Sequence, residues 1–97
     1  MTTSRAATAT DRLGVCEGVS VREFDGEWIV LDLNGGNYFG LDQLGGAIWQ
    51  ELSAGKSPVE VVALLGKQYE VEEAIMLRDV LGLVDELIER RLMRIGG

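Results

Sequence analysis

The spacing of apolar residues divides the chain into a strand-rich half and a helix-rich half. Residues 19 to 24 and 27 to 33 are rich in β-branched and aromatic side chains, and the Asp25-Gly26 pair between them is a strong signal for a two-residue hairpin turn. Asn34-Gly35-Gly36 supplies a second tight turn, after which residues 37 to 41 predict a short third strand. The first half therefore predicts a three-stranded antiparallel meander.

The two-residue repeat of a pleated strand assigns the side chains of the second strand to two faces. One face carries Ile29, Leu31 and Leu33, and the other carries Trp28, Val30 and Asp32. We expect the first set to face the core.

The second half carries helical spacing with clear start and stop signals. Asp42 stands at the N-cap position of a first helix that ends near Gly55. The run Ser57-Pro58-Val59-Glu60 combines a capping box with proline at the first helical position and opens a second helix. A third helix is predicted from about Glu72 to Arg91, with acidic residues in its first turn and arginines in its last. The fold class is therefore α+β, with an N-terminal three-stranded antiparallel sheet followed by three helices.

The length of 97 residues suits one compact domain. Residues 1 to 14 are rich in Thr, Ala and Ser and lack an apolar repeat, so we expect a flexible N-terminal tail there and the folded domain over residues 15 to 97. No stretch approaches the roughly 20 apolar residues that span a bilayer, and the polar start lacks the apolar middle region of a signal peptide. We expect a cytoplasmic protein without a membrane span.

The composition argues against several classes of function. Histidine is absent, which removes the commonest general base and the commonest metal ligand. The single cysteine, Cys16, cannot form an internal disulfide and has no neighbouring metal ligand. The net charge of −7 would repel a phosphate backbone. The sequence thus favours a non-catalytic protein with no cofactor, no metal and no nucleic-acid partner.

The third helix has an unusually wide apolar arc of roughly 180°, whereas a surface helix needs only somewhat more than about 100°. The arc contains Met76, Leu83, Leu87, Val80, Val84, Leu77, Ile88, Leu81 and Ala74. Its centre should pack into the core, whereas Met76 and Leu83 lie at the margin beside Asp79 and could line a groove. The alternative is a helix buried on two sides in a small three-helix arrangement, and periodicity alone leaves both open.

The predicted strand of residues 37 to 41 is expected at the sheet edge, with unpaired backbone groups facing outward. An edge strand beside an apolar helix can receive an extended peptide through main-chain hydrogen bonds, with side-chain pockets giving specificity. Each such bond contributes only about 0.5 to 1.5 kcal/mol net, so a flexible peptide also needs anchor side chains. We expect their pocket near Tyr38, Met76 and Leu83.

Several runs in this order resemble the signature of PqqD-like domains. They are Trp28-Ile29-Val30-Leu31-Asp32-Leu33, Tyr38-Phe39-Gly40-Leu41 and Gly46-Ala47-Ile48-Trp49, followed by Ser57 to Val62 with Tyr69 and by Arg78-Asp79-Val80 with Leu83, Val84 and Leu87. The similarity covers about residues 17 to 95. It implies a winged-helix-like fold that binds the leader of a ribosomally made peptide as an added strand, against the third strand and the third helix.

The resemblance also implies a set of leader-peptide contacts. These fall on Asn37, Tyr38, Phe39, Met76, Asp79, Val80 and Leu83. The chain looks most similar to the free-standing recognition element of lasso-peptide pathways, which implies delivery of the precursor to a leader peptidase and a downstream cyclase. The related peptide chaperone of pyrroloquinoline quinone synthesis, which serves a radical enzyme, is the alternative within the family.

Three rivals come from other classes. A winged-helix DNA-binding protein fits the element order, but residues 72 to 91 hold six acidic residues against three arginines and would repel DNA. An enzyme that uses the acidic residues has no base, nucleophile or cofactor motif to support it. A structural subunit would cover the surplus apolar face of the third helix with a partner or a second copy.

Overall fold

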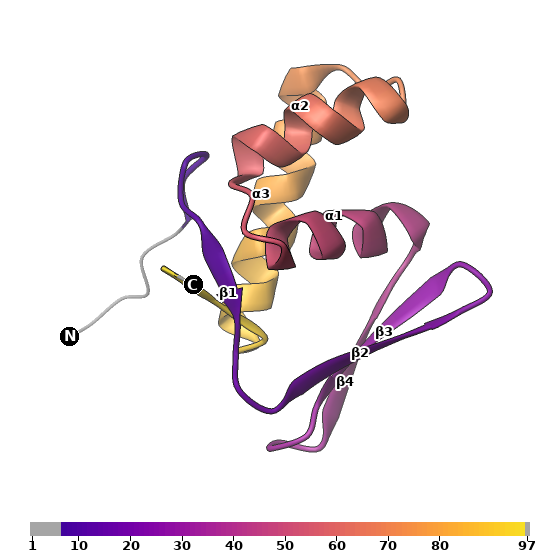
Figure 1. The fold of residues 1–97 in the computed structure, drawn as a ribbon, viewed down its shortest axis with the longest axis vertical. Coiled ribbons are helices and arrows are strands. Elements are labelled where there is room, and N and C mark those ends of the chain that lie inside the picture. The colour runs from indigo at the N-terminus through magenta and orange to yellow at the C-terminus, as the bar shows by residue number, and fades with distance from the viewer. Residues whose placement is uncertain (1–6, 97) are drawn as a thin grey trace.

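The computed structural model describes residues 7–96, which form two small antiparallel sheets and three helices (Figure 1). The larger sheet consists of β2 (Val19–Phe24), β3 (Glu27–Asp32) and β4 (Asn37–Leu41), in that order. Three helices follow: α1 (Gln43–Ser53), α2 (Pro58–Gln68) and α3 (Glu73–Glu89). The smaller sheet pairs β1 (Leu13–Val15) with β5 (Met93–Ile95). The predicted α+β fold, with a three-stranded sheet followed by three helices, is confirmed.

The turns of the larger sheet form as their residues predict. Asp25 and Gly26 both have positive φ, 51° and 84°, as a hairpin turn that follows the natural twist of the strands requires. This turn sets the register of β2 and β3, in which Phe24 pairs with Glu27. At the second turn, Oδ1 of Asp32 accepts hydrogen bonds from the backbone N–H groups of Asn34 and Gly35.

The expectation about the faces of β3 is wrong. Val30 is 0% exposed and Trp28 packs against the core, whereas Leu33 is 69% exposed. The register places Val30 between Val21 and Phe39, so the core face of the sheet is the one that also carries Asp32. This aspartate is tolerated there because it lies at the end of the strand and its carboxylate caps the next turn.

Both helix starts predicted from capping residues are confirmed. Asp42 accepts a hydrogen bond of 2.7 Å from the backbone N–H of Gly45 at the start of α1. At the start of α2, the side chains of Ser57 and Glu60 each accept from the other residue's backbone N–H, which completes the capping box. These caps fix where the chain turns from the sheet into the helices.

The core lies where the three helices meet the inner face of the sheet. Its fully buried large side chains are Leu52, Met76, Leu87, Met93, Val30, Val61, Val80, Val84 and Pro58. α3 alone supplies four of them, at positions spaced three or four residues apart, as one face of a helix requires. Within residues 7–96, no helix is both long enough and apolar enough to cross a membrane.

The predicted flexible tail is too long at its C-terminal end. Leu13 is 3% exposed and belongs to β1, where it pairs with Ile95. Residues 7 to 12 also contact the domain, because the carbonyl of Ala9 accepts a hydrogen bond from the backbone N–H of Val59. The pairing of β1 with β5 joins opposite ends of the described chain, so short-range sequence patterns gave no sign of it. Residues 1 to 6 lie outside the described residues.

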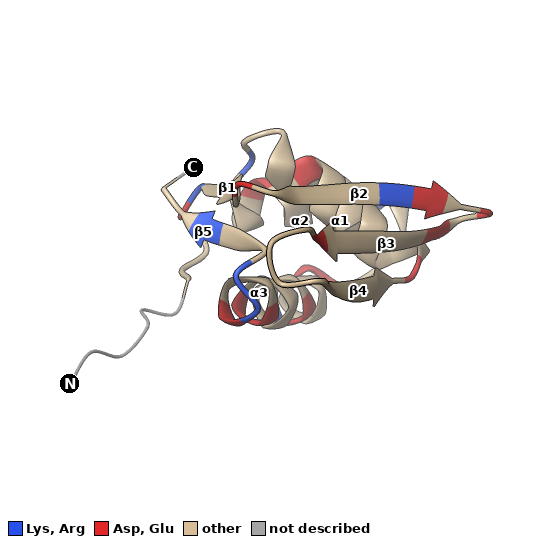
Figure 2. Cartoon of the chain, turned by 90° about the horizontal axis from the view of Figure 1, so that it is seen from below, with Lys and Arg blue, Asp and Glu red and all other residues tan. Residues whose placement is uncertain are grey.

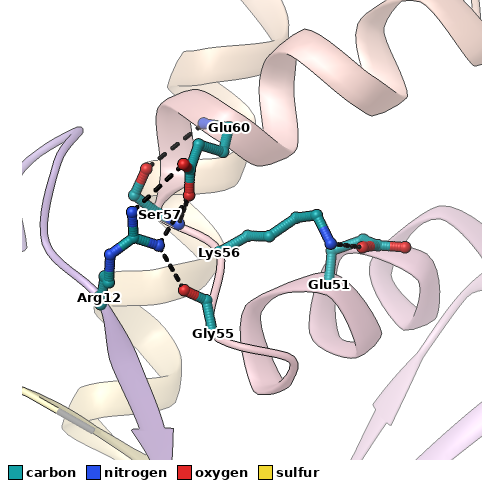
Figure 3. Close-up of polar contacts among 6 residues, drawn as sticks. All are labelled: Arg12, Glu51, Gly55, Lys56, Ser57 and Glu60. Atoms are coloured by element: carbon teal, nitrogen blue, oxygen red, sulfur yellow. Dashed lines mark hydrogen bonds and ion pairs between the residues drawn. The ribbon is translucent and has the colours of Figure 1, made fainter.

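Arg12 attaches this N-terminal segment to α2 (Figure 3). Its guanidinium group donates to both carboxylate oxygens of Glu60, at 2.8 and 3.2 Å, and also to the carbonyl oxygen of Gly55. Hydrogen bonds from Arg12 and from the backbone of Ser57 lower the pKa of Glu60 from 4.5 to about 2. One carboxylate thus joins the N-terminal segment to the cap of α2.

We expect this contact to make stability depend on pH in the acidic range. Because the pKa of Glu60 is lower in the folded state, the stabilisation is complete above about pH 4.5 and is lost as the pH falls towards 2. Glu60→Gln should therefore be less stable than the parent at pH 7. The difference in stability should shrink as the pH falls from about 4.5 towards 2. Urea unfolding at a series of pH values measures it, with Glu89→Gln as the control for loss of an exposed carboxylate. A difference that does not change with pH would contradict this account.

A second prediction concerns the contact between the sheet and α1. A Cβ atom on Gly46 would lie only 2.1 Å from Cδ1 of Trp28, so the indole ring packs directly on the helix backbone. We expect Gly46→Ala to destabilise the domain by about 1 to 3 kcal/mol through overpacking. Gly82→Ala is the matched control, because nothing lies within 4 Å of its added Cβ. In urea titrations Gly82→Ala should stabilise the domain by about 0.5 to 1 kcal/mol through helix propensity. Similar effects of Gly46→Ala and Gly82→Ala on stability would argue against the Trp28 contact.

Candidate peptide-binding groove

β4 is an edge strand of the larger sheet, and within residues 7–96 no strand pairs with its outer side. Figure 2 shows β4 as the strand of this sheet nearest α3. Phe39 and Leu41 point towards the helices, because they pair with Val30 and Trp28 of the core face. Tyr38 and Gly40 lie on the outer face of the sheet. The strand therefore offers backbone hydrogen-bonding groups along its edge and side chains on both sides of it.

The opposite wall is a stripe of α3 residues that recur every three or four positions and so share one face of the helix. This stripe consists of Ile75, Asp79, Leu83, Glu86 and Arg90, the last of which is the C-cap of α3. Leu83 is half-buried and packs against the core, and the others are exposed. The wall thus has an apolar centre at Leu83, flanked by Asp79 on one side and by Glu86 and Arg90 on the other, with the apolar Ile75 at its N-terminal end.

A hollow of about 340 Å³ lies between the C-terminal end of β4, α1 and α3. Its apolar lining comes from Leu41, Leu44, Ile48 and Leu83, and the remaining lining residues are Gly40, Asp42, Gly45 and Asp79. We call it the Leu83 hollow. It has the size and apolar floor that an anchor side chain of a peptide needs.

A second, smaller hollow of about 190 Å³ lies at the other end of β4. It is lined by Asp32, Asn37, Tyr38, Phe39, Arg90 and Leu92. The guanidinium carbon of Arg90 lies 4.6 Å from the centre of the Phe39 ring, and its Nε and Nη2 atoms donate to Glu86 at 3.2 and 3.1 Å. The stacking and the ion pair hold Arg90 in place across the groove. We call this the Arg90 hollow.

Five of the seven residues predicted as leader contacts line these hollows. They are Asn37, Tyr38 and Phe39 on β4 and Asp79 and Leu83 on α3. Tyr38 is 73% exposed and also borders a broader depression along β3 and β4 that reaches the start of α1. The predicted strand and helix residues therefore lie along one groove, but Tyr38 and Leu83 line different hollows and do not share the expected pocket.

The other two predicted contacts, Met76 and Val80, are both 0% exposed and belong to the core. The expectation that Met76 lies at the groove margin is wrong, because Met76 packs into the core, whereas Leu83 beside it at the same edge of the arc lines the Leu83 hollow. The sequence analysis also missed Ile75, Glu86 and Arg90. Their spacing from Asp79 and Leu83 was the available signal. Glu86 and Arg90 were passed over because an apolar arc selects only hydrophobic residues, and Ile75 because it lies outside that arc. Within residues 7–96, no group of three or more histidine, cysteine or acidic side chains could hold a metal ion.

The sequence of this chain matches a known protein family. The family described as coenzyme PQQ synthesis protein D (PqqD) matches residues 27–93, which contain β3 to α3 and therefore both walls of the groove. The chain belongs to this family. A comparison of this chain with the curated proteins found no match.

Three solved structures are similar to the whole domain. TbiB1 in complex with the TbiA(beta) leader peptide has a TM-score of 0.77 and 32% sequence identity, covering 87% of this chain and 95% of that chain. Lasso peptide synthetase B1 complexed with the leader peptide has a TM-score of 0.79 and 31% identity, covering 86% and 98%. The PqqD truncation of Methylobacterium extorquens PqqCD, a stand-alone recognition element for ribosomally synthesised and modified peptides, has a TM-score of 0.76 and 22% identity, covering 92% and 96%, and supports the fold.

The different burial of two α3 residues leads to a stability prediction. Met76→Ala should destabilise the domain by about 2 to 5 kcal/mol, because it opens a cavity in the core. Leu83→Ala should cost less, because part of this side chain already faces the Leu83 hollow. Chemical denaturation of both variants tests the assignment. A larger loss at Leu83 than at Met76 would show that α3 is rotated relative to the orientation described above.

Proposed function

We propose that this protein is a non-catalytic adaptor that binds the leader segment of a ribosomally synthesised precursor peptide. The observation that carries the proposal is the open edge of β4 facing α3 across two hollows. It is supported by similarity, above 30% identity, to two proteins solved as complexes with leader peptides. Binding by strand addition fits this geometry, since the edge supplies backbone partners and the hollows supply side-chain sites.

In this mode, alternate residues of the leader face opposite sides of the sheet. Side chains beside Leu41 and Phe39 enter the groove towards α3, whereas those beside Tyr38 and Gly40 lie over the outer face. Because each backbone hydrogen bond contributes only about 0.5 to 1.5 kcal/mol net, affinity rests mainly on the inward anchors. The proposed contact residues are therefore Asn37, Tyr38, Phe39, Asp79 and Leu83.

The pathway is part of the same proposal. We propose that the protein acts in the cytoplasm and presents the bound leader to a leader peptidase and then to a cyclase in lasso-peptide synthesis. The assignment to lasso-peptide synthesis is supported by the similarity to lasso peptide synthetase B1. A role as peptide chaperone in pyrroloquinoline quinone synthesis is the second candidate, because the matching family is described by that pathway. A DNA-binding role is disfavoured: α3 holds five acidic residues and one arginine between Glu73 and Glu89.

Fluorescence polarisation tests the binding function directly. Labelled overlapping peptides from candidate precursors encoded near this gene are titrated with the protein, and one leader segment should bind saturably at micromolar concentration or tighter. Leu83→Arg should weaken that binding at least tenfold, because it places a charge in the Leu83 hollow. Leu81→Arg is the matched control, since Leu81 is a half-buried leucine of the same helix that lines neither hollow.

Both variants are first checked for folding by circular dichroism. Equal losses of affinity in two folded variants would argue against this groove as the binding site. Failure of every precursor segment to bind the parent protein would contradict the adaptor function and favour a structural subunit. Size-exclusion chromatography would then reveal a dimer or a stable partner.

A further inference from the structure

The Leu83 hollow combines an apolar floor with carboxylates at its rim. Its charged lining residues are Asp42 and Asp79, and neither lysine nor arginine lines it. The Asp42 carboxylate is partly engaged, because it caps α1 through the backbone N–H of Gly45. Asp79 is exposed and forms no hydrogen bond or ion pair with any other residue in the range 7–96. An unpaired carboxylate therefore stands one helical turn from Leu83, at the mouth of the hollow.

The Arg90 hollow differs in charge. There the guanidinium group of Arg90 is paired with Glu86 and stacked on Phe39, and the other charged lining residue is Asp32. A cation entering that end would meet an arginine, whereas one entering the Leu83 hollow would meet carboxylates alone. The two ends of the groove are thus electrostatically distinct, so a charged side chain can fix the register of a bound strand.

We propose that the Leu83 hollow receives a lysine or arginine side chain of the leader segment. The aliphatic stem of that side chain lies on Leu83, Leu44 and Ile48, while its cationic end pairs with Asp79. Long basic side chains commonly bury their methylene groups in this way and keep the charge at the surface. The inference rests on the proposed function and adds to it the chemical class of one anchor.

Strand geometry places this anchor relative to the second hollow. The side chain that enters the Leu83 hollow is the one beside Leu41, and the inward side chain nearest the Arg90 hollow is the one beside Asn37. These positions are four residues apart on the leader, or about 13 Å. A basic residue one position away would point to the outer face instead. The preference should therefore be confined to a single leader position.

The test is a substitution scan of the leader segment that binds the parent protein. Each of its residues is replaced in turn by lysine, glutamine or glutamate, and affinities are measured by fluorescence polarisation. At one position lysine should bind about two- to fivefold more tightly than glutamine, and glutamate more weakly than both. In Asp79→Asn the lysine preference should fall to about onefold, and in Asp79→Lys glutamate should become the preferred residue.

Asp85→Asn is the matched control. It removes the same charge from an exposed position on α3 that lines neither hollow, so it should leave the lysine preference unchanged. If the leader binds but its lysine preference is absent, or is equal in Asp79→Asn and Asp85→Asn, the inference is overturned while the adaptor function stands. If no precursor segment binds the parent protein, the adaptor function itself fails.

Discussion

The rotation of α3 about its own axis is the constraint on which the groove depends. Met76, Val80, Val84 and Leu87 are completely buried and define one face of the helix. Turning α3 in the direction of the stripe would bring Asp79 or Glu86 towards the core, which costs far more than a conservative change in packing. With this face held inward, the stripe from Ile75 to Arg90 must face the edge of β4.

The second wall is held by a different contact, in which the indole ring of Trp28 packs on the backbone of α1 at Gly46. Trp28 is paired with Leu41, so the same contact places the end of β4 beside the start of α1. Leu41 then contributes to the Leu83 hollow together with Leu44 and Ile48. The packing that stabilises the domain thus also sets the shape of its proposed binding site. No separate loop or element is needed to form the Leu83 hollow.

Local signals in the sequence predict most of the fold. The Asp25-Gly26 turn, the N-cap at Asp42 and the capping box at Ser57 each depend on a few adjacent residues, and each is confirmed. The failures arise where distant residues decide the outcome. Asp32 made one face of β3 look polar, although its carboxylate is satisfied by the following turn. Met76 was predicted at the groove margin because the spacing of residues on a helix does not show which edge of its apolar arc the rest of the domain covers.

The pairing of β1 with β5 has a consequence for how the domain forms during synthesis. A chain leaves the ribosome from its N-terminus, so Leu13 is made early but cannot be covered by β5 until nearly all of the described chain has emerged. Leu92, which immediately precedes β5, is also part of the Arg90 hollow. A nascent chain could therefore form the β2–β4 meander and the Leu83 hollow first. It would complete the groove only when its last strand closes on its first.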